Sequence, residues 1–184
     1  MNKAKALLDL AKEIEECHEC KKDTLGMAVP GEGNPDAKIA FIGEAPGKTE
    51  AETGRPFVGR SGKLLRSLIR EVGLTEKEVY ITSPVKRLPK KGTPTDKQIT
   101  HGRKHLIKQL QVINPEIIVL LGSVAVRAIL DEKLPVLKRH GEIVKKNGRN
   151  YFLTLHPAAA IRFVKFKKII ISDFAKLKPL TLSL

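Results

Sequence analysis

Apolar runs alternate along the chain with segments in which apolar residues recur every three or four positions. The runs predict buried strands, and the periodic segments predict amphipathic helices that pack against them. The predicted strands are residues 37–42, 79–82, 117–121 and 151–154. The predicted helices are residues 3–16, 61–72, 95–113, 123–130 and 158–177, and residues 135–144 are predicted to form a β-hairpin. Continuous apolar strands between helices are typical of a parallel sheet covered on both faces, so we expect an α/β fold in a single domain over residues 1–184.

Polar residues, glycines and prolines directly follow each of the four predicted strands. These segments are residues 43–47, 83–86, 122–123 and 155–157. The carboxyl ends of parallel strands meet at one edge of a sheet, and ligands bind in the crevice outside that edge. We therefore place the functional site at this edge.

Charge is the unusual feature of the composition. The 184 residues include 34 Lys and Arg against 20 Asp and Glu, a formal net charge of +14. Residues 138–184 hold eleven basic and two acidic residues (11 − 2 = +9), whereas the first twenty residues sum to −2. So basic a surface favours a polyanion as partner, either nucleic acid or an anionic membrane, and a solvated lysine face is the alternative.

Membrane insertion and a disulfide framework are both disfavoured. No apolar run reaches the roughly 18 residues typical of a transmembrane helix. The two cysteines, Cys17 and Cys20, are too close in the sequence to staple a fold. We expect a monomeric, thiol-reduced protein of the cytoplasm.

The segment 43–59, GEAPGKTEAETGRPFVG, holds the densest group of chemically active residues. Its glycines and prolines constrain a loop that offers backbone N–H groups, carboxylates and one aromatic ring. It lacks the terminal Gly-Lys-Ser/Thr of a phosphate-binding loop and the GxGxxG of a dinucleotide site. These absences argue against a nucleotide-binding α/β protein, and the residues alone predict a binding loop of unknown ligand.

Segment 43–59 resembles the first motif of the family 4 uracil-DNA glycosylases. Residues 80–86 (YITSPVK) and 156–162 (HPAAAIR) resemble the second and third motifs, and the order and spacing agree over about residues 1–177. The resemblance implies a three-layer α/β/α sandwich around a central four-stranded parallel sheet. It also implies a monofunctional glycosylase of base excision repair, which flips uracil out of DNA, hydrolyses its N-glycosidic bond and needs no metal at the reaction centre.

The implied reaction gives each matched residue an expected role. The bond breaks through a cation-like sugar and an anionic uracil, so we expect His156 to stabilise the uracil oxyanion. Glu44 or Glu50 would orient the water or stabilise the sugar cation, and Phe57 would stack on the flipped base. The residues expected to shape the uracil pocket or contact the edge of the base are Gly43, Ala45, Pro46, Gly47 and Ser83. The residues expected to bind DNA phosphates are Lys86, Arg162 and Lys165.

Ser83 departs from the family pattern, which has an asparagine at this position. Asparagine offers a donor and an acceptor together, whereas serine offers one rotatable hydroxyl. The change leaves open a wider range of deaminated bases, such as hypoxanthine, or a weakly active or non-catalytic DNA-damage-binding module. Some relatives link covalently to uracil through a histidine in the next loop; residues 86–91 contain none, which disfavours that variant.

A second departure concerns the 4Fe–4S cluster of the family, which four cysteines hold. Cys17 and Cys20 match the first pair, but Arg87 and His101 align with the other two ligands. Because arginine cannot ligate a metal here, a four-cysteine cluster is excluded.

The same region has the ligand spacing of a zinc site. His101 and His105 would lie on one face of a predicted helix, and Cys-x2-Cys with His-x3-His is typical of tetrahedral zinc. We expect a structural zinc ion on Cys17, Cys20, His101 and His105, with His18 as a spare ligand. The alternative is a decayed site that binds no metal.

Overall fold

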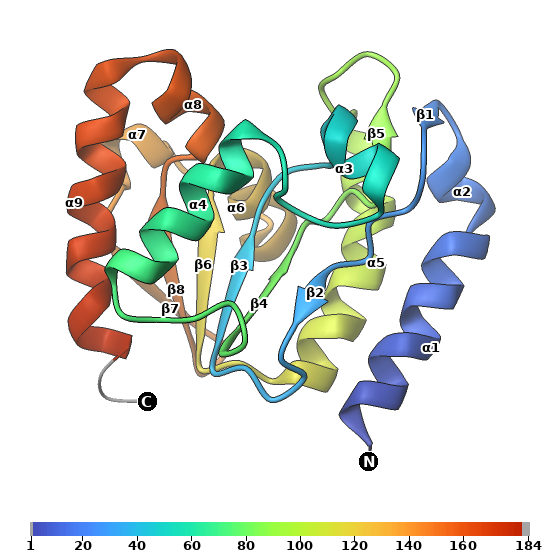
Figure 1. The fold of residues 1–184 in the computed structure, drawn as a ribbon, viewed down its shortest axis with the longest axis horizontal. Helices are drawn as coiled ribbons and strands as arrows, with labels where there is room; N and C mark the ends of the chain where they lie inside the picture. The colour runs from blue at the N-terminus through green and yellow to red at the C-terminus, as the bar shows by residue number, and fades with distance from the viewer. Residues whose placement is uncertain (1, 182–184) are drawn as a thin grey trace.

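The computed structural model describes residues 2–181, and its central feature is a twisted sheet between two layers of helices (Figure 1). The strands are β1 (Thr24–Leu25), β2 (Glu32–Gly33), β3 (Ile39–Ile42), β4 (Val79–Thr82), β5 (Leu88–Pro89), β6 (Ile117–Leu121), β7 (Ile143–Lys146) and β8 (Arg149–Thr154). The helices are α1 (Lys3–Glu16), α2 (His18–Lys21), α3 (Lys48–Thr53), α4 (Arg60–Glu71), α5 (Asp96–Ile113), α6 (Ser123–Leu130), α7 (Val136–Arg139), α8 (Pro157–Arg162) and α9 (Val164–Thr181).

Within residues 2–181 the main sheet has six strands in the order β2-β4-β3-β6-β8-β7. The inner four, β4, β3, β6 and β8, are parallel, as expected. The edge strands β2 and β7 are antiparallel additions that the apolar pattern did not predict. Strand β7 alternates exposed and half-buried residues, because an antiparallel edge strand can pack against the protein on one face and meet solvent on the other.

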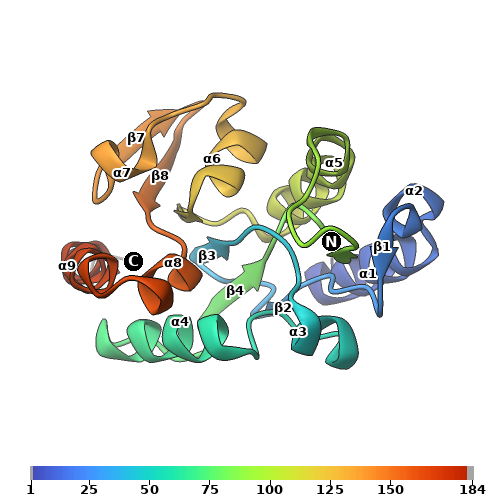
Figure 2. The same cartoon turned by 90° about the horizontal axis from the view of Figure 1, so that it is seen from above.

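Two hydrophobic cores flank the sheet, and together they confirm the three-layer α/β/α architecture (Figure 2). Alternate residues of each inner strand point to opposite faces. Ala40 and Ile42 of β3 pack in the core beneath α1, α5 and α6. Ile39 and Phe41 pack in the core beneath α4, α8 and α9, where the Phe41 and Phe174 rings stack at 6.0 Å.

Two local predictions near the C-terminus are wrong. The predicted helix over residues 158–177 is broken at Phe163, whose extended backbone separates α8 from α9. The predicted hairpin over residues 135–144 is absent from the described chain; α7 lies there, and β7 and β8 form the hairpin instead. Its turn is Asn147–Gly148, both with positive φ (50° and 73°), which suits the twist of a two-residue hairpin.

None of the helices within residues 2–181 combines the length and apolar character that crossing a membrane would require.

Candidate active site and metal site

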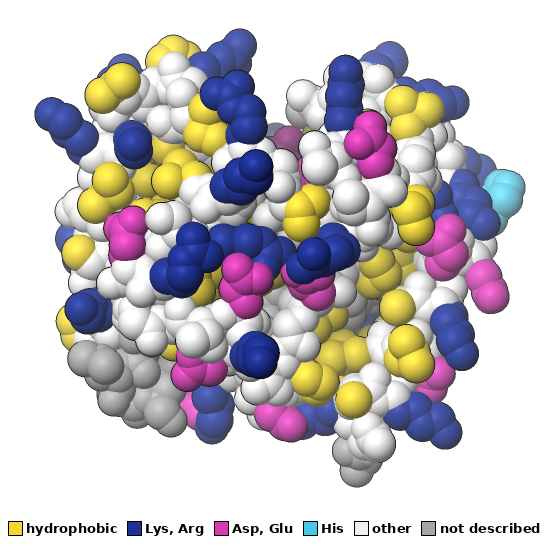
Figure 3. All heavy atoms as spheres, viewed as in Figure 1, with side chains coloured by type: hydrophobic (Ala, Val, Ile, Leu, Met, Phe, Trp, Pro, Cys, Tyr) yellow, Lys and Arg dark blue, Asp and Glu magenta, His cyan; other side chains and the backbone are white. Residues whose placement is uncertain are grey.

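A pocket of about 250 Å³ opens at the carboxyl edge of the parallel strands, where the sequence placed the site. Its walls come from two sides: the start of α8 with the loop before α4, and α3 with the loop around β5. In Figure 3 this is a notch at the upper edge of the molecule, with Lys and Arg side chains on both rims. The predicted site residues that line it are Glu44, Ala45, Pro46, Gly47, Glu50, Phe57, Ser83 and His156.

Phe57 packs beside the pocket with its ring next to His156. The two ring centroids are 5.8 Å apart with an interplanar angle of 32°. Gly43 makes this packing possible, because a Cβ there would lie 2.4 Å from the Phe57 ring. The lack of a side chain at Gly43 therefore allows the Phe57 ring to occupy its position beside the pocket.

His156 is a neutral hydrogen-bond donor by virtue of its surroundings. Burial lowers the pKa of His156 to about 4, so the ring carries one proton at neutral pH. Its Nδ1 accepts the backbone N–H of Ala158 at 3.1 Å, as the N-cap of α8. The proton is thereby assigned to Nε2, which is left to donate to a ligand.

The two candidate carboxylates have different environments. Burial raises the pKa of Glu44, an effect that the Arg127 charge partly opposes. The Glu50 carboxylate accepts three backbone N–H groups, from Gly47 (3.1 Å), Val58 (2.8 Å) and Gly59 (2.7 Å). Glu50 ties the two arms of the 43–59 loop together, whereas within residues 2–181 the Glu44 carboxyl has no hydrogen-bond partner.

Ser83 is buried, and its hydroxyl donates to the Val85 carbonyl at 2.8 Å. The donor of Ser83 is therefore occupied. Toward the pocket the hydroxyl oxygen can act as an acceptor only.

The prediction that Lys86 binds DNA is wrong, because this side chain is 1% exposed. Its ammonium donates to Thr82 Oγ1 (2.8 Å), Gln109 Oε1 (2.7 Å) and the Pro30 carbonyl (3.1 Å). Burial lowers the pKa of Lys86 to about 7. Lys86 joins β4, α5 and the segment before β2, and no phosphate can reach it.

Arg162 and Lys165, in contrast, are exposed at the corner between α8 and α9. Arg162 lies over the Phe163 ring, 5.9 Å from its centroid, and Lys165 lies 5.1 Å from the centroid of Phe166. The apolar side chains of Phe163 and Val164 between them are 47% and 77% exposed. The corner thus presents cations and apolar groups together, beside the pocket.

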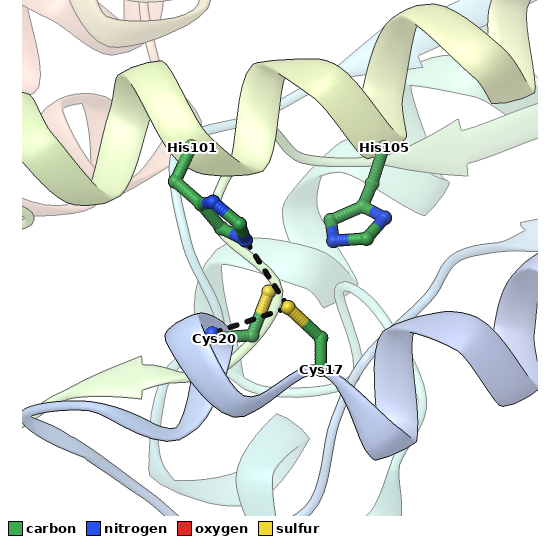
Figure 4. A group of neighbouring side chains, drawn as sticks. All are labelled: Cys17, Cys20, His101 and His105. Carbon is green, nitrogen blue, oxygen red and sulfur yellow. Dashed lines mark hydrogen bonds between the residues drawn. The ribbon is translucent and has the colours of Figure 1, made fainter.

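The four predicted metal ligands converge between the α1–α2 corner and α5 (Figure 4). One ligand atom from each of Cys17, Cys20, His101 and His105 lies within 4.8 Å of the others. Cys17 Sγ lies 3.1 Å from His101 Nε2. His18 lies outside this group and is exposed. The group could hold a metal ion.

The buried imidazole of His105 in this cluster lacks hydrogen-bond partners within the described chain. His105 is 5% exposed, and neither of its ring nitrogens has a hydrogen bond within the described chain. Its Nδ1 lies 3.4 Å from the Glu13 carboxylate without hydrogen-bond geometry. Burial raises the pKa of Cys20 to about 12, an effect that a bound cation would reverse. A cation would therefore satisfy groups that the protein leaves unsatisfied.

Arg87 does not complete a four-ligand cluster of the kind implied by the resemblance. Its guanidinium donates to the Gly26 carbonyl and to the backbone and side chain of Glu15, the latter at 2.6 Å. The residues present fit one ion held by two thiolates and two imidazoles, and they do not fit a four-cysteine iron–sulfur cluster.

Several functional positions escaped the sequence analysis. Further residues that line the pocket are Val29, Pro56, Ser61, Leu88, Gly92 and Ala158. Ala158 contributes the N–H that fixes the His156 tautomer, and only its position after a strand-end His-Pro could have signalled this. The assembled pocket offers an aromatic face, an N–H donor, an acceptor and a carboxyl group, which suits a flat polar heterocycle.

Comparison with known proteins shows which family this chain is similar to. A family model described as the uracil DNA glycosylase superfamily matches residues 30–175. The type-4 uracil-DNA glycosylase of Sulfurisphaera tokodaii is 39% identical, over 95% of this chain and 86% of the relative. That of Thermotoga maritima is 36% identical, over 94% of this chain and 93% of the relative. That of Saccharolobus solfataricus is 39% identical, over 93% and 85% respectively.

Proposed function

Because the chain belongs to the type-4 branch of the uracil-DNA glycosylase superfamily, we propose that it hydrolyses the N-glycosidic bond of uracil in DNA. The product is an abasic site, and the process is base excision repair. One observation carries the proposal: the Nε2–H donor of His156, the Phe57 ring and the Glu44 carboxyl lie around one pocket at the carboxyl edge of the sheet.

His156 and Phe57 act on the base in this mechanism. Uracil flips out of the duplex, enters the pocket and stacks against Phe57. As the glycosidic bond breaks, negative charge builds on the uracil carbonyl, and His156 Nε2–H stabilises it. A neutral imidazole does this without gaining or losing a proton, which agrees with the lowered pKa of His156.

Glu44 acts on the sugar side. Its half-buried carboxyl, free of protein hydrogen bonds within residues 2–181, is suited to orient the attacking water or to stabilise the positive sugar. Glu50, which uses its carboxylate on three backbone N–H groups, holds the loop that carries Phe57. We therefore assign catalysis to Glu44 and loop positioning to Glu50.

A uracil-containing oligonucleotide tests the function directly. After incubation with the protein, alkali cleaves the strand at abasic sites, and a strand with thymine in place of uracil is the control. Appearance of the shortened strand supports the glycosylase. If excess protein yields no product but still retards the uracil strand in a gel, the protein is a damage-binding module.

Ser83 sets how the base edge is read. With its proton bonded to the Val85 carbonyl, its oxygen can accept uracil N3–H, whereas cytosine presents an unprotonated N3. Ser83→Asn adds a donor to this acceptor, so we expect kcat/KM for uracil to rise about tenfold, the value of one good hydrogen bond. Single-turnover excision on strands with uracil, cytosine or hypoxanthine measures it. A fall in uracil excision would show that the pocket is tuned to the hydroxyl.

The corner between α8 and α9 is the proposed DNA-binding surface. Arg162 and Lys165 would neutralise phosphates, and the exposed Phe163 would wedge into the opened base stack. Anionic DNA, rather than a membrane, is the polyanion that the glycosylase reaction requires.

The double variant R162Q/K165Q is expected to bind DNA more weakly while keeping kcat at saturating substrate. Each lost phosphate contact lowers the slope of log K against log salt by about 1, so the expected decrease is about 2. Fluorescence anisotropy across a salt series measures the slope. The matched control is K5Q/K12Q on α1, and an equal slope change in both double variants would contradict the assignment.

For the cluster of Cys17, Cys20, His101 and His105 we propose a structural zinc ion. Zinc–ligand bonds of about 2.0–2.3 Å in a tetrahedron place ligand atoms within about 4 Å of one another, which is compatible with the observed 4.8 Å limit before an ion draws them in. The ion would supply folding stability by joining the α1–α2 corner to α5. It lies apart from the pocket residues, so no catalytic step depends on it.

The free cysteines fit a reducing compartment. We propose that the protein acts there, in the cytoplasm, as a monomer formed by a single domain.

A further inference from the structure

Arg66 of α4 is a buried cation next to the pocket that the mechanism above does not use. Its side chain is 10% exposed. The guanidinium donates to the Phe57 carbonyl (2.9 Å, from Nε), the Pro56 carbonyl (2.8 Å) and the Glu32 carboxylate (2.6 Å, both from Nη2), and Nη1 donates to Glu76. A guanidinium engaged in this many directions is held in one orientation.

Phe57, whose carbonyl accepts one of these bonds, has an uncommon backbone conformation. Its φ is +52°, in the left-handed region that a bulky L residue adopts only when its surroundings enforce it. α4 also approaches closely at Gly62, where a Cβ would lie 2.0 Å from the Phe57 carbonyl carbon. The conformation therefore needs the local contacts to persist.

The loop is clamped on both sides of Phe57. Arg66 holds the carbonyls of residues 56 and 57, and Glu50 holds the N–H groups of residues 58 and 59. The ring between the two clamps faces the pocket beside His156. A fixed ring is a better stacking surface than a mobile one, because no ordering is required when the base arrives.

We propose that Arg66 is a positioning residue that holds the Phe57 ring in the orientation on which the flipped uracil stacks. The inference rests on the proposed uracil-excision function. Glu32 of β2 and Glu76, in the loop after α4, hold the Arg66 guanidinium in place through ion pairs. An edge strand remote from the reacting bond thereby contributes to base recognition.

Substitutions on α4 test the proposal. Arg66→Gln removes the positive charge and the branched guanidinium group. Arg66→Lys keeps a cation for Glu32, but its single ammonium group cannot reach the Pro56 and Phe57 carbonyls at once. Arg70→Gln is the matched control, because Arg70 lies one turn along the same helix, is 60% exposed and pairs with Glu76 at 3.6 Å. The measured quantities are the inhibition constant of free uracil and the separate values of kcat and KM, at a temperature where thermal scans show every variant folded.

Both Arg66 variants are expected to weaken uracil binding about tenfold with a smaller change in kcat, since a displaced contact group costs binding before chemistry. Arg70→Gln should match the wild type. If Arg66 acts through Phe57, then adding Arg66→Gln to Phe57→Ala changes the inhibition constant no further. Unchanged uracil binding in both Arg66 variants, or additive effects with Phe57→Ala, would overturn the inference.

A readout without activity separates this inference from the proposed function. In the free protein, nuclear Overhauser contacts between the Phe57 and His156 rings are expected in the wild type and in Arg70→Gln, and are expected to disappear in Arg66→Gln. Wild-type protein that releases no uracil would refute the proposed function, and the ring contacts would still decide whether Arg66 positions Phe57. Contacts that persist in Arg66→Gln would refute the positioning role even in an active enzyme.

Discussion

Replacing His156 is expected to slow uracil excision by about 10²–10³-fold, the usual effect of removing one donor from a developing oxyanion. The residue has a second task, because its Nδ1 caps α8 through the Ala158 N–H. His156→Ala removes both the donor and the cap, and the lost cap costs about 1 kcal/mol of stability. His156→Asn retains a good capping side chain but is too short to place a donor where Nε2 lies.

The comparison of these two variants separates catalysis from stability. Single-turnover excision should fall by similar factors in His156→Ala and His156→Asn, whereas the melting temperature should fall mainly in His156→Ala. If His156→Asn excises uracil at the wild-type rate, then His156 is only a helix cap and the proposed mechanism is wrong.

The pH dependence of stability gives an independent test of the His156 environment. Its folded pKa, about 4, lies below the ordinary histidine value of 6.5, so the unfolded chain binds the proton more tightly. The contribution of neutral His156 to the free energy of unfolding is therefore fully present above pH 6.5 and is lost as the pH falls from 6.5 toward about 4. Urea unfolding of the wild type and His156→Asn across this range isolates the effect, since all other titrating groups are shared. Parallel stability curves would contradict the burial of a neutral His156.

Removal of the proposed zinc ion is expected to have the largest effect on stability. Protein purified without added metal should contain one zinc ion per chain and show no visible absorbance. Binding to the folded state alone stabilises it by about 4 kcal/mol when free zinc exceeds Kd a thousandfold, so chelation should lower the free energy of unfolding by several kcal/mol. Excision measured below the lowered melting temperature should persist, because none of the four candidate ligands lines the pocket.

Single substitutions locate the effect in the cluster. Cys20→Ser and His105→Ala should each lose the ion and melt at a lower temperature even before chelation. His18→Ala is the matched control, because His18 is exposed on α2 between the two cysteines and outside the cluster. Bound iron with visible absorbance, or full stability with no metal at all, would contradict the zinc proposal.

The regular elements were largely predictable because local pattern and tertiary burial agree. Strands β4 and β6 coincide with the predicted apolar runs, since residues in central parallel strands are buried on both faces. The differences lie where the apolar pattern and the tertiary structure disagree. Asn147–Gly148 forms the turn of the hairpin outside the range that the apolar pattern predicts, and the break at Phe163 interrupts a pattern typical of one helix.

The sequence by itself predicted the inner strands, most of the long helices, the edge at which the site lies and the four residues that come together as candidate metal ligands. Those features depend on periodicity, on strand ends, on ligand spacing within each pair and on motif resemblance, all of which are visible without the tertiary structure. The tertiary structure alone decided the surroundings of the charged residues Lys86 and Arg66. Whether a charged side chain meets water, a ligand or the protein depends on partners from distant segments: Lys86 is satisfied by α5 and by the segment before β2, and Arg66 by β2 and the Phe57 loop. Folding brings those partners together. As a result Lys86, which was expected on the DNA-binding surface, is buried and bonded within the protein, and Arg66, which belongs to none of the sequence motifs, holds the loop that carries the Phe57 ring.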